Sequence, residues 1–320
     1  MGQRNLLLCF DAFGTLFKPK RPVPEQYAAV ARQCGLHLNT TQVETSFQAA
    51  FLQEAKAHPN YGKASDMGAS AWWTNVIHET FQPLLGPHRA LPRDLAPKLL
   101  ERFSSSAGYT LAPGLPSLLR SLRKQQQQQQ RSAATAHPYQ IVVGVITNSD
   151  DRVPGILSSF GFRVSPVRFG SPISLAEVVP EQHQFDIDFH CMSYDVGSSK
   201  PERRIFDAAE AMAMRLAALQ GSADTDHRGG GVGHGVPWLK LYIGDEFEKD
   251  GKAANSAGWN SVLVGLGADT GEQVNLLNLD PCGTVALDDV FPQEGSPSMI
   301  RAENIRGVLE WLIDQYGRTG

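Results

Sequence analysis

A short apolar run near the start of the chain, residues 6–10 (LLLCF), ends abruptly at Asp11. Apolar runs of this length are typical of parallel strands buried on both faces, and Gly14 and Thr15 break the run as a turn would. An acid is thereby placed at the carboxyl end of a strand, where open α/β sheets bind their ligands. Taken alone, Asp11 is equally consistent with a residue that only caps the turn.

A second run of this kind, residues 141–146 (IVVGVI), ends in Thr147, Asn148 and Ser149, which offer hydroxyl and amide groups. Lys200 follows later, directly before a segment with helical character. A lone lysine is usually a solvated surface residue, so Lys200 gains meaning only from its place in this order.

A third run, residues 239–243 (LKLYI), ends in a group of acids that includes Asp245, Glu246 and Asp250. An acid, a hydroxyl, a lysine and paired acids therefore follow one another along the chain. Loops that leave the carboxyl ends of parallel strands converge at one edge of the sheet. The order predicts that these side chains form a single site.

Strand-like runs alternate with helical segments, which predicts an α/β fold, a Rossmann-like doubly wound parallel sheet with right-handed crossovers. We expect further strands at residues 185–192 and 261–265, the second being the last strand of the core. An amphipathic helix that includes Ile305, Val308 and Leu312 then closes the chain.

Between residues 22 and 108 the strand pattern gives way to helical periodicity. This predicts a helical insert at 22–108 within a discontinuous core formed by residues 1–21 and 109–320. Trp72 and Trp73 could line a pocket in the insert, but adjacent residues on a helix point in different directions, so at most one of them does so.

Two segments, residues 125–137 and 220–236, have few apolar residues to bury and are expected to be flexible inserts. The first holds six consecutive glutamines, which we interpret as a solvated loop or a frayed helix extension. The second is rich in glycine, and its two histidines, His227 and His234, are too isolated to predict a metal site. Residues 164–184 are expected to form a surface loop.

Composition limits the class of protein. The 320-residue chain is long enough for a core with an inserted unit, and its net charge of −4 argues against a general nucleic-acid surface. Its four cysteines lack the paired spacing of a zinc site, and the first apolar run is too short for a signal peptide or a membrane helix. We therefore expect an intracellular protein, cytoplasmic or nuclear, that does not act on membranes.

The chain resembles the haloacid dehalogenase superfamily of hydrolases, and the match spans the whole chain. The four motifs of that superfamily match, in order, the stretches that contain Asp11, Thr147, Lys200 and Asp245. Residues between the motifs look like one subgroup of that superfamily: 58–62 (HPNYG), 72–73 (WW), 80–81 (TF) and 200–206 (KPERRIF). The resemblance implies that residues 22–108 are a cap that closes over the active site and selects the substrate.

Asp11 is the predicted nucleophile, because a carboxylate can carry a transferred group as an acyl phosphate or an ester. Mg²⁺ prefers oxygen ligands in octahedral geometry with several waters retained. Asp11 and Asp245 would supply two carboxylates, and the resemblance implies the backbone carbonyl of Phe13 as a further ligand. Asp250, at the spacing of the resembled motif, would anchor the metal or its waters, with Glu246 as the competitor for that role.

Three residues are expected to bind phosphate. Lys200 would offset the charge on Asp11 and on the phosphate group, while the Thr147 hydroxyl and donors of neighbouring residues, including Asn148, would hold phosphate oxygens. The predicted ligand is a small-molecule phosphate ester.

Phe13 departs from the phosphatase pattern, in which a second aspartate stands two residues after the nucleophile and protonates the leaving oxygen. General acid–base help is typically worth ~10²–10⁴-fold, so a phosphatase without it is slow, uses an activated leaving group or has a substitute acid. Three hypotheses stay open. The first is a Mg²⁺-dependent phosphatase that acts through an aspartyl-phosphate on a small phosphorylated metabolite. The second is a regulatory or binding protein without efficient turnover, and the third is a 2-haloacid dehalogenase, which would need no Mg²⁺.

Overall fold

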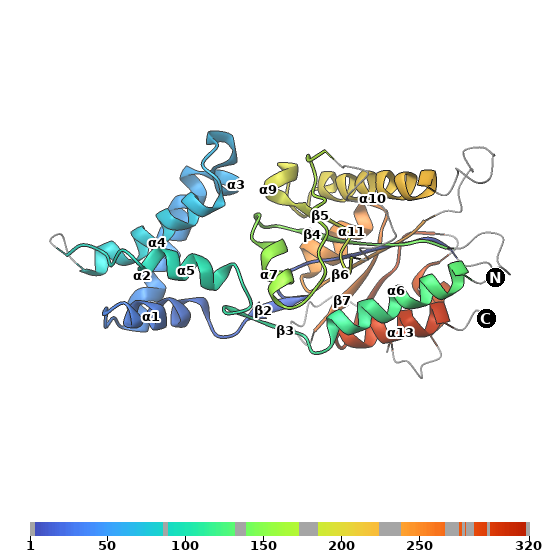
Figure 1. Cartoon of the computed structure of the whole chain (residues 1–320), viewed down its shortest axis with the longest axis horizontal. Helices are drawn as coiled ribbons and strands as arrows, with labels where there is room; N and C mark the ends of the chain where they lie inside the picture. Colours follow the sequence, from blue (N-terminus) through green and yellow to red (C-terminus); the bar gives the residue numbers. More distant parts are fainter. Residues whose placement is uncertain are drawn as a thin grey trace. The chain divides into compact units, whose positions relative to one another are not determined.

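A computed structural model describes residues 4–85, 89–131, 139–172, 185–223, 238–265, 275–276, 279, 285–292 and 295–317. The chain divides into two compact units, coloured by sequence in Figure 1. The first comprises Met1–Phe17, Leu111–Asn148 and Gly161–Gly320, and the second comprises Lys18–Thr110 and Ser149–Phe160. The second unit takes in the expected helical insert and also residues 149–160, which the sequence analysis assigns to the core.

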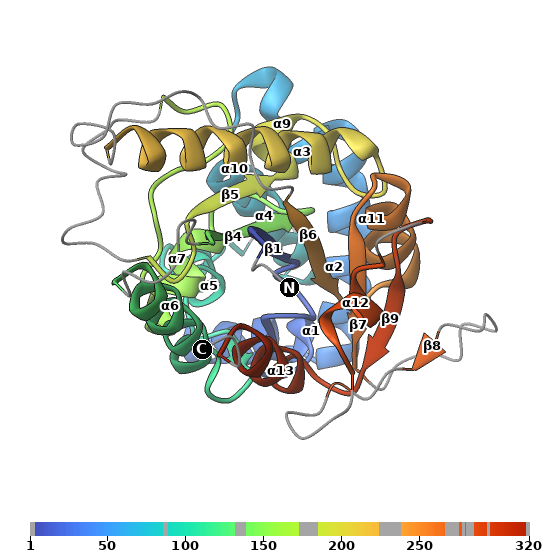
Figure 2. The ribbon, with the colours of Figure 1, turned by 90° about the vertical axis from the view of Figure 1, so that its right-hand side faces the viewer.

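A parallel sheet of seven strands in the order β5-β4-β1-β6-β7-β9-β8 forms the centre of the first unit (Figure 2). Its strands are β1 (Leu6–Phe10), β4 (Ile141–Thr147), β5 (Phe189–Met192), β6 (Leu239–Gly244), β7 (Asn260–Val264), β8 (Asn275–Leu276) and β9 (Met299–Ala302). The chain proceeds from β1 to β4 and β5 on one side and returns to β6 on the other. The predicted Rossmann-like doubly wound fold is confirmed.

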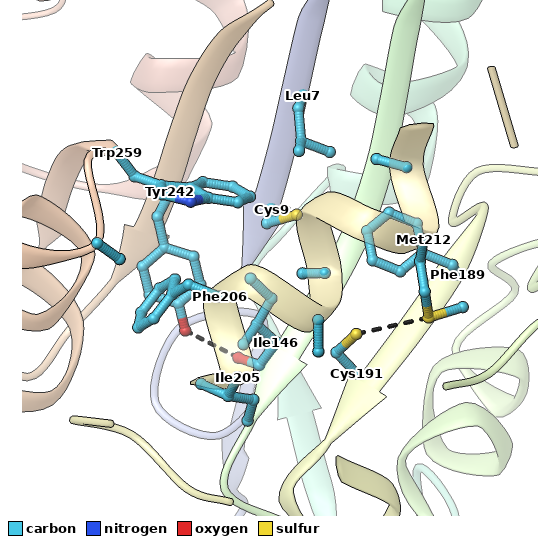
Figure 3. Packing of buried hydrophobic residues seen from close by; sticks show 14 of the residues in the cluster. Leu7, Cys9, Ile146, Phe189, Cys191, Ile205, Phe206, Met212, Tyr242 and Trp259 are labelled. Atoms are coloured by element: carbon cyan, nitrogen blue, oxygen red, sulfur yellow. Dashed lines mark hydrogen bonds between the residues drawn. The ribbon is translucent and has the colours of Figure 1, made fainter. Parts of the chain in front are cut away.

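Helices cover both faces of the sheet. Helix α10 (Arg203–Ala223) lies on one face, and α6 (Leu115–Arg131) and α13 (Ile305–Gly317) lie together on the other (Figure 2). Because side chains alternate along a strand, Leu7 and Cys9 of β1 join the cluster under α10 (Figure 3). Shorter helices complete the unit: α9 (Ser193–Val196), the π-helix η3 (Phe247–Lys252), α11 (Ala253–Ser256) and α12 (Leu287–Val290).

The second unit is mostly helical. Its elements are α1 (Val23–Gln33), α2 (Thr40–Ala57), α3 (Pro59–Gly62), η1 (Lys63–Ser65), α4 (Ala69–Leu85), α5 (Leu95–Phe103) and α7 (Val153–Ser159). Asn39 caps α2 by accepting a hydrogen bond from the Thr41 N–H. Trp72 is buried in the core of this unit and Trp73 is half-buried, so the two rings do differ in environment. The short strands β2 (Phe17–Pro19) and β3 (Tyr109–Leu111) pair in a separate sheet.

Three expectations about the core are corrected. Strand β7 is not the last, since β9 pairs with it and completes the sheet with β8. Strand β5 begins at Phe189 rather than 185. Residues 164–169 are no surface loop, because their backbone bonds to Ile187 and His190 beside β5 and Val167 is buried.

The glutamine run is helical rather than a loop, since α6 continues through it to Arg131, as the frayed-extension interpretation allowed. Glutamine is a good helix former, and α6 packs along α13, so the helix does not end where the apolar residues do. Helix α10 similarly extends to Ala223. The rest of the two expected inserts, with His227 and His234, lies outside the described residues.

Cys9 and Cys191 are buried free thiols and Cys34 is a partly exposed one. Within the described part of the chain, no helix is both long and apolar enough to cross a bilayer.

Candidate active site

Three adjacent strands bring the predicted site residues to one edge of the sheet. Strand β1 lies between β4 and β6, with Phe10 aligned to Val145 on one side and to Ile243 on the other. Asp11, Thr147 and Asp245 follow or end these strands at their carboxyl ends. Because the strand order reverses between β1 and β6, this edge is the topological switch point, where doubly wound sheets bind ligands.

Lys200 joins the strand ends from the segment before α10. Its ammonium group donates to Asp11 Oδ1 at 2.7 Å and to Asp250 Oδ1 at 2.6 Å, and its side chain is only 3% exposed. The Asn148 carboxamide holds the Lys200 backbone, accepting from its N–H at 2.7 Å and donating to its carbonyl at 2.9 Å. Asn148 therefore positions Lys200, and that Asn148 binds phosphate stays a prediction.

A carboxylate cluster lies beside Lys200. One oxygen from each of Asp11, Asp245 and Asp250 lies within 4.8 Å of the others. Thr15 Oγ1 donates to Asp245 Oδ1 at 3.0 Å. Gly14 has φ +95°, and a Cβ atom there would lie 2.1 Å from Asp245 Oδ2. Glycine is thus required at position 14 for the backbone after β1 to approach this carboxylate.

Asp250 organises the loop that carries Asp245. Its Oδ2 accepts from the backbone N–H groups of Asp245 at 3.0 Å and Glu246 at 2.9 Å. Gly244 leaves room for it, since a Cβ there would lie 2.3 Å from Asp250 Cγ. The Glu246 side chain instead pairs with Lys249 at 2.6 Å and is 56% exposed. Of the two competing acids, Asp250 is therefore the one inside the cluster.

The charges in the cluster shift its titration. Burial raises the pKa of Asp11 to about 6, with Lys200 and the Thr147 hydrogen bond opposing the shift and Asp250 adding to it. Burial also raises the pKa of Asp245, with Thr15 opposing. Burial acts to lower the pKa of Lys200, but Asp11 and Asp250 outweigh it and raise the pKa. Three acids face one buried ammonium, and oxygen ligands of this charge suit a divalent cation such as Mg²⁺.

Phe13 brings no acid to the site. Its ring packs edge-on against Phe17, with ring centroids 4.8 Å apart. That the Phe13 carbonyl binds metal stays a prediction.

Tyr242 is a site residue that the sequence analysis missed. It lies on β6, is fully buried, and its hydroxyl accepts from the Lys200 ammonium at 2.8 Å. Its hydroxyl, on the buried half of β6 two residues before Gly244, was the available signal.

Known proteins resemble this chain. The HAD-hydrolase-like family model matches residues 198–290. A putative uncharacterized hydrolase of Schizosaccharomyces pombe is 28% identical over 81% of this chain and 90% of its own length. Haloacid dehalogenase-like hydrolase domain-containing protein 3 of Bos taurus is 27% identical over 90% of this chain and 88% of its own.

Among solved structures, an L-2-haloacid dehalogenase has a TM-score of 0.51 at 13% identity, covering 96% of this chain and 98% of that one, which shows a shared fold. The chain therefore combines a doubly wound α/β fold with sequence similarity to hydrolases. The similarity is to haloacid dehalogenase-like hydrolases, over residues 198–290 for the family model and over most of the chain for the bovine relative.

Proposed function

We propose that the protein is a Mg²⁺-dependent phosphatase that hydrolyses a small phosphate ester through a phosphoaspartyl intermediate on Asp11. The observation that supports this most is the carboxylate cluster, in which oxygens of Asp11, Asp245 and Asp250 lie within 4.8 Å of one another beside Lys200. A dehalogenase that works without metal has no need of three acids at this edge.

Asp11 and Asp245, with the Phe13 carbonyl, would hold the ion directly. One carboxylate oxygen of Asp250 accepts from Lys200 and the other accepts from two backbone N–H groups, so Asp250 would hold the loop in place around the metal. Bound there, Mg²⁺ supplies positive charge that offsets the charge of the phosphate.

The chain's own groups account for the covalent steps. A carboxylate oxygen of Asp11 attacks phosphorus, the bond to the ester oxygen breaks, and that oxygen leaves with the bonding electron pair. Phe13 has no proton to give, so the leaving oxygen takes one from solvent or leaves as a stable anion. Water then attacks the phosphoaspartate, which releases inorganic phosphate and restores Asp11. Lys200 keeps Asp11 ionised by pairing with it.

Phe13 favours a second candidate, a regulatory or binding protein that holds a phosphorylated ligand without efficient turnover. The acid position is filled by a half-buried ring packed on Phe17, so leaving groups that need protonation would turn over slowly.

Two assays on one preparation test the proposal. Hydrolysis of an aryl phosphate should require Mg²⁺, and halide release from a 2-haloacid should stay at background. Asp11→Asn, which changes few atoms at the strand edge, should abolish the hydrolysis while circular dichroism stays unchanged. Halide release without metal would establish a dehalogenase instead. Binding of phosphate with Mg²⁺ but no turnover of any ester would favour the binding protein, and full activity in Asp11→Asn would exclude Asp11 as nucleophile.

A further inference from the structure

The Lys200 ammonium group has three N–H donors, and the structure gives each an acceptor. Asp11 Oδ1 and Asp250 Oδ1 are two of them, and the Tyr242 hydroxyl, at 2.8 Å, is the third. The lysine is 3% exposed at its side chain, so water contributes little to its solvation. With all three protons engaged, its direction is set by these acceptors together.

The Tyr242 hydroxyl is itself fixed. Two acceptors lie within reach of its single proton, the Ile146 carbonyl at 2.8 Å and Asp250 Oδ1 at 3.4 Å. The shorter bond, drawn as a dashed line in Figure 3, holds the proton on the Ile146 carbonyl, so a lone pair faces the ammonium group. Its ring is held edge-on by Phe206, with centroids 5.2 Å apart, in the buried cluster that also contains Trp259. A rigid ring on β6 thus carries a hydroxyl that joins the carboxyl end of β4 to Lys200.

We propose that Tyr242 is a positioning residue, which orients the Lys200 ammonium group onto Asp11. Without the hydroxyl, Lys200 would keep two carboxylates, and nothing at the third position would hold it between them. The catalytic part of this proposal rests on the proposed phosphatase function, whereas the orientation of Lys200 does not.

The alternative is a purely structural hydroxyl, one that only satisfies the Ile146 carbonyl. The two roles differ in one respect that can be measured. A positioning role acts through Lys200, so removing the hydroxyl matters only while the lysine is present. A structural role affects stability alike with and without the lysine.

Tyr242→Phe is the informative variant, because it removes one oxygen and keeps the ring. Tyr139→Phe is its matched control: Tyr139 is also a buried tyrosine, and its hydroxyl has no hydrogen-bond partner within the described part of the chain. We expect kcat on an aryl phosphate with Mg²⁺ to fall by about tenfold or more in Tyr242→Phe, as for loss of a hydrogen bond to a charged group, with KM little changed. Tyr139→Phe should keep the parent kcat.

A double-mutant cycle with Lys200→Met then decides the route of the effect. If Tyr242 acts through Lys200, adding Tyr242→Phe to the Lys200→Met variant should lower kcat by less than twofold. Where kcat is too low to measure, the affinity for beryllium trifluoride in the presence of Mg²⁺ is compared instead, with the same limit. Equal losses in both backgrounds, or unchanged kcat in Tyr242→Phe, would overturn the proposal.

A measurement that needs no turnover separates this proposal from the phosphatase function. In a ¹H–¹⁵N spectrum of lysine ammonium groups, the parent protein should show a Lys200 signal, which is identified by its loss in Lys200→Met. The protons of this signal should show cross-peaks to the Tyr242 ring. Tyr242→Phe should make its protons exchange with water several times faster, while Tyr139→Phe leaves the rate unchanged. Absence of the cross-peaks in the parent would refute the orientation even if Tyr242→Phe failed to fold. Absence of turnover with the spectrum as expected would refute only the phosphatase function.

Discussion

Replacing Phe13 by Asp should raise phosphatase activity, because it adds the one acid that the site lacks. The new carboxyl would stand two residues after Asp11, where it can protonate the leaving oxygen and then activate water. The backbone carbonyl at position 13 is unaffected by the exchange. Toward an alkyl phosphate, a poor leaving group, we expect kcat/KM to rise by at least ~10-fold, the low side of general acid catalysis and equivalent to ~1.4 kcal/mol of barrier. An activated aryl phosphate should gain less.

The exchange also has a cost in stability. It removes the edge-on ring contact with Phe17 and part of the apolar burial of a half-buried side chain, together about 2 kcal/mol. Since folded domains of this kind are stable by ~5–15 kcal/mol, the variant should remain folded, and rates are to be compared per folded molecule after circular dichroism and thermal melting.

Phe13→Asn is the matched control, because it makes nearly the same change in size and apolar contact without a titratable proton. It should show the loss of stability but no gain in rate. If Phe13→Asp gains nothing on either ester while Mg²⁺ still binds, or if Phe13→Asn gains as much, leaving-group protonation is not what limits this protein, and the binding role becomes the better hypothesis.

Two further predictions test the metal loop and the core. Gly14→Ala should reduce Mg²⁺ affinity and aryl phosphate hydrolysis more than tenfold, because the added Cβ would lie 2.1 Å from Asp245 Oδ2. The control is Gly161→Ala, which also has a positive φ (+86°) but nothing within 4 Å of the added atom, so it should lose only stability. Calorimetric Mg²⁺ titration compares the two variants, and equal Mg²⁺ affinities would contradict the role of Gly14. Burial lowers the pKa of His190 from 6.5 to about 4, so below pH 6.5 the unfolded chain binds a proton that the folded chain does not. The contribution of His190 to the free energy of unfolding should therefore fall by up to ~3 kcal/mol between pH 6.5 and pH 4. Urea titrations of the parent and of His190→Asn over this pH range measure that contribution as the difference between the two slopes, and equal slopes would show that His190 is not responsible.

The sequence by itself determined the parts of this protein that depend on local pattern. Apolar runs long enough to fill a buried strand predicted β1, β4 and β6, and the polar residues at their ends predicted which side chains meet at one sheet edge. Parallel strands leave no choice about where those ends converge, which is why the positions of Asp11 and Asp245 could be read without coordinates.

Tertiary structure decided what depends on partners far away in the chain. The pattern of acids could not tell Glu246 from Asp250, and only the folded loop shows one exposed beside Lys249 and the other under Lys200. Strand β9 escaped prediction because its short, mixed sequence becomes a strand only by pairing with β7. Tyr242 looked like any aromatic of a buried strand, since its place beside Lys200 comes from packing between residues 42 positions apart. Such hydrogen bonds follow from three-dimensional packing rather than from local propensity.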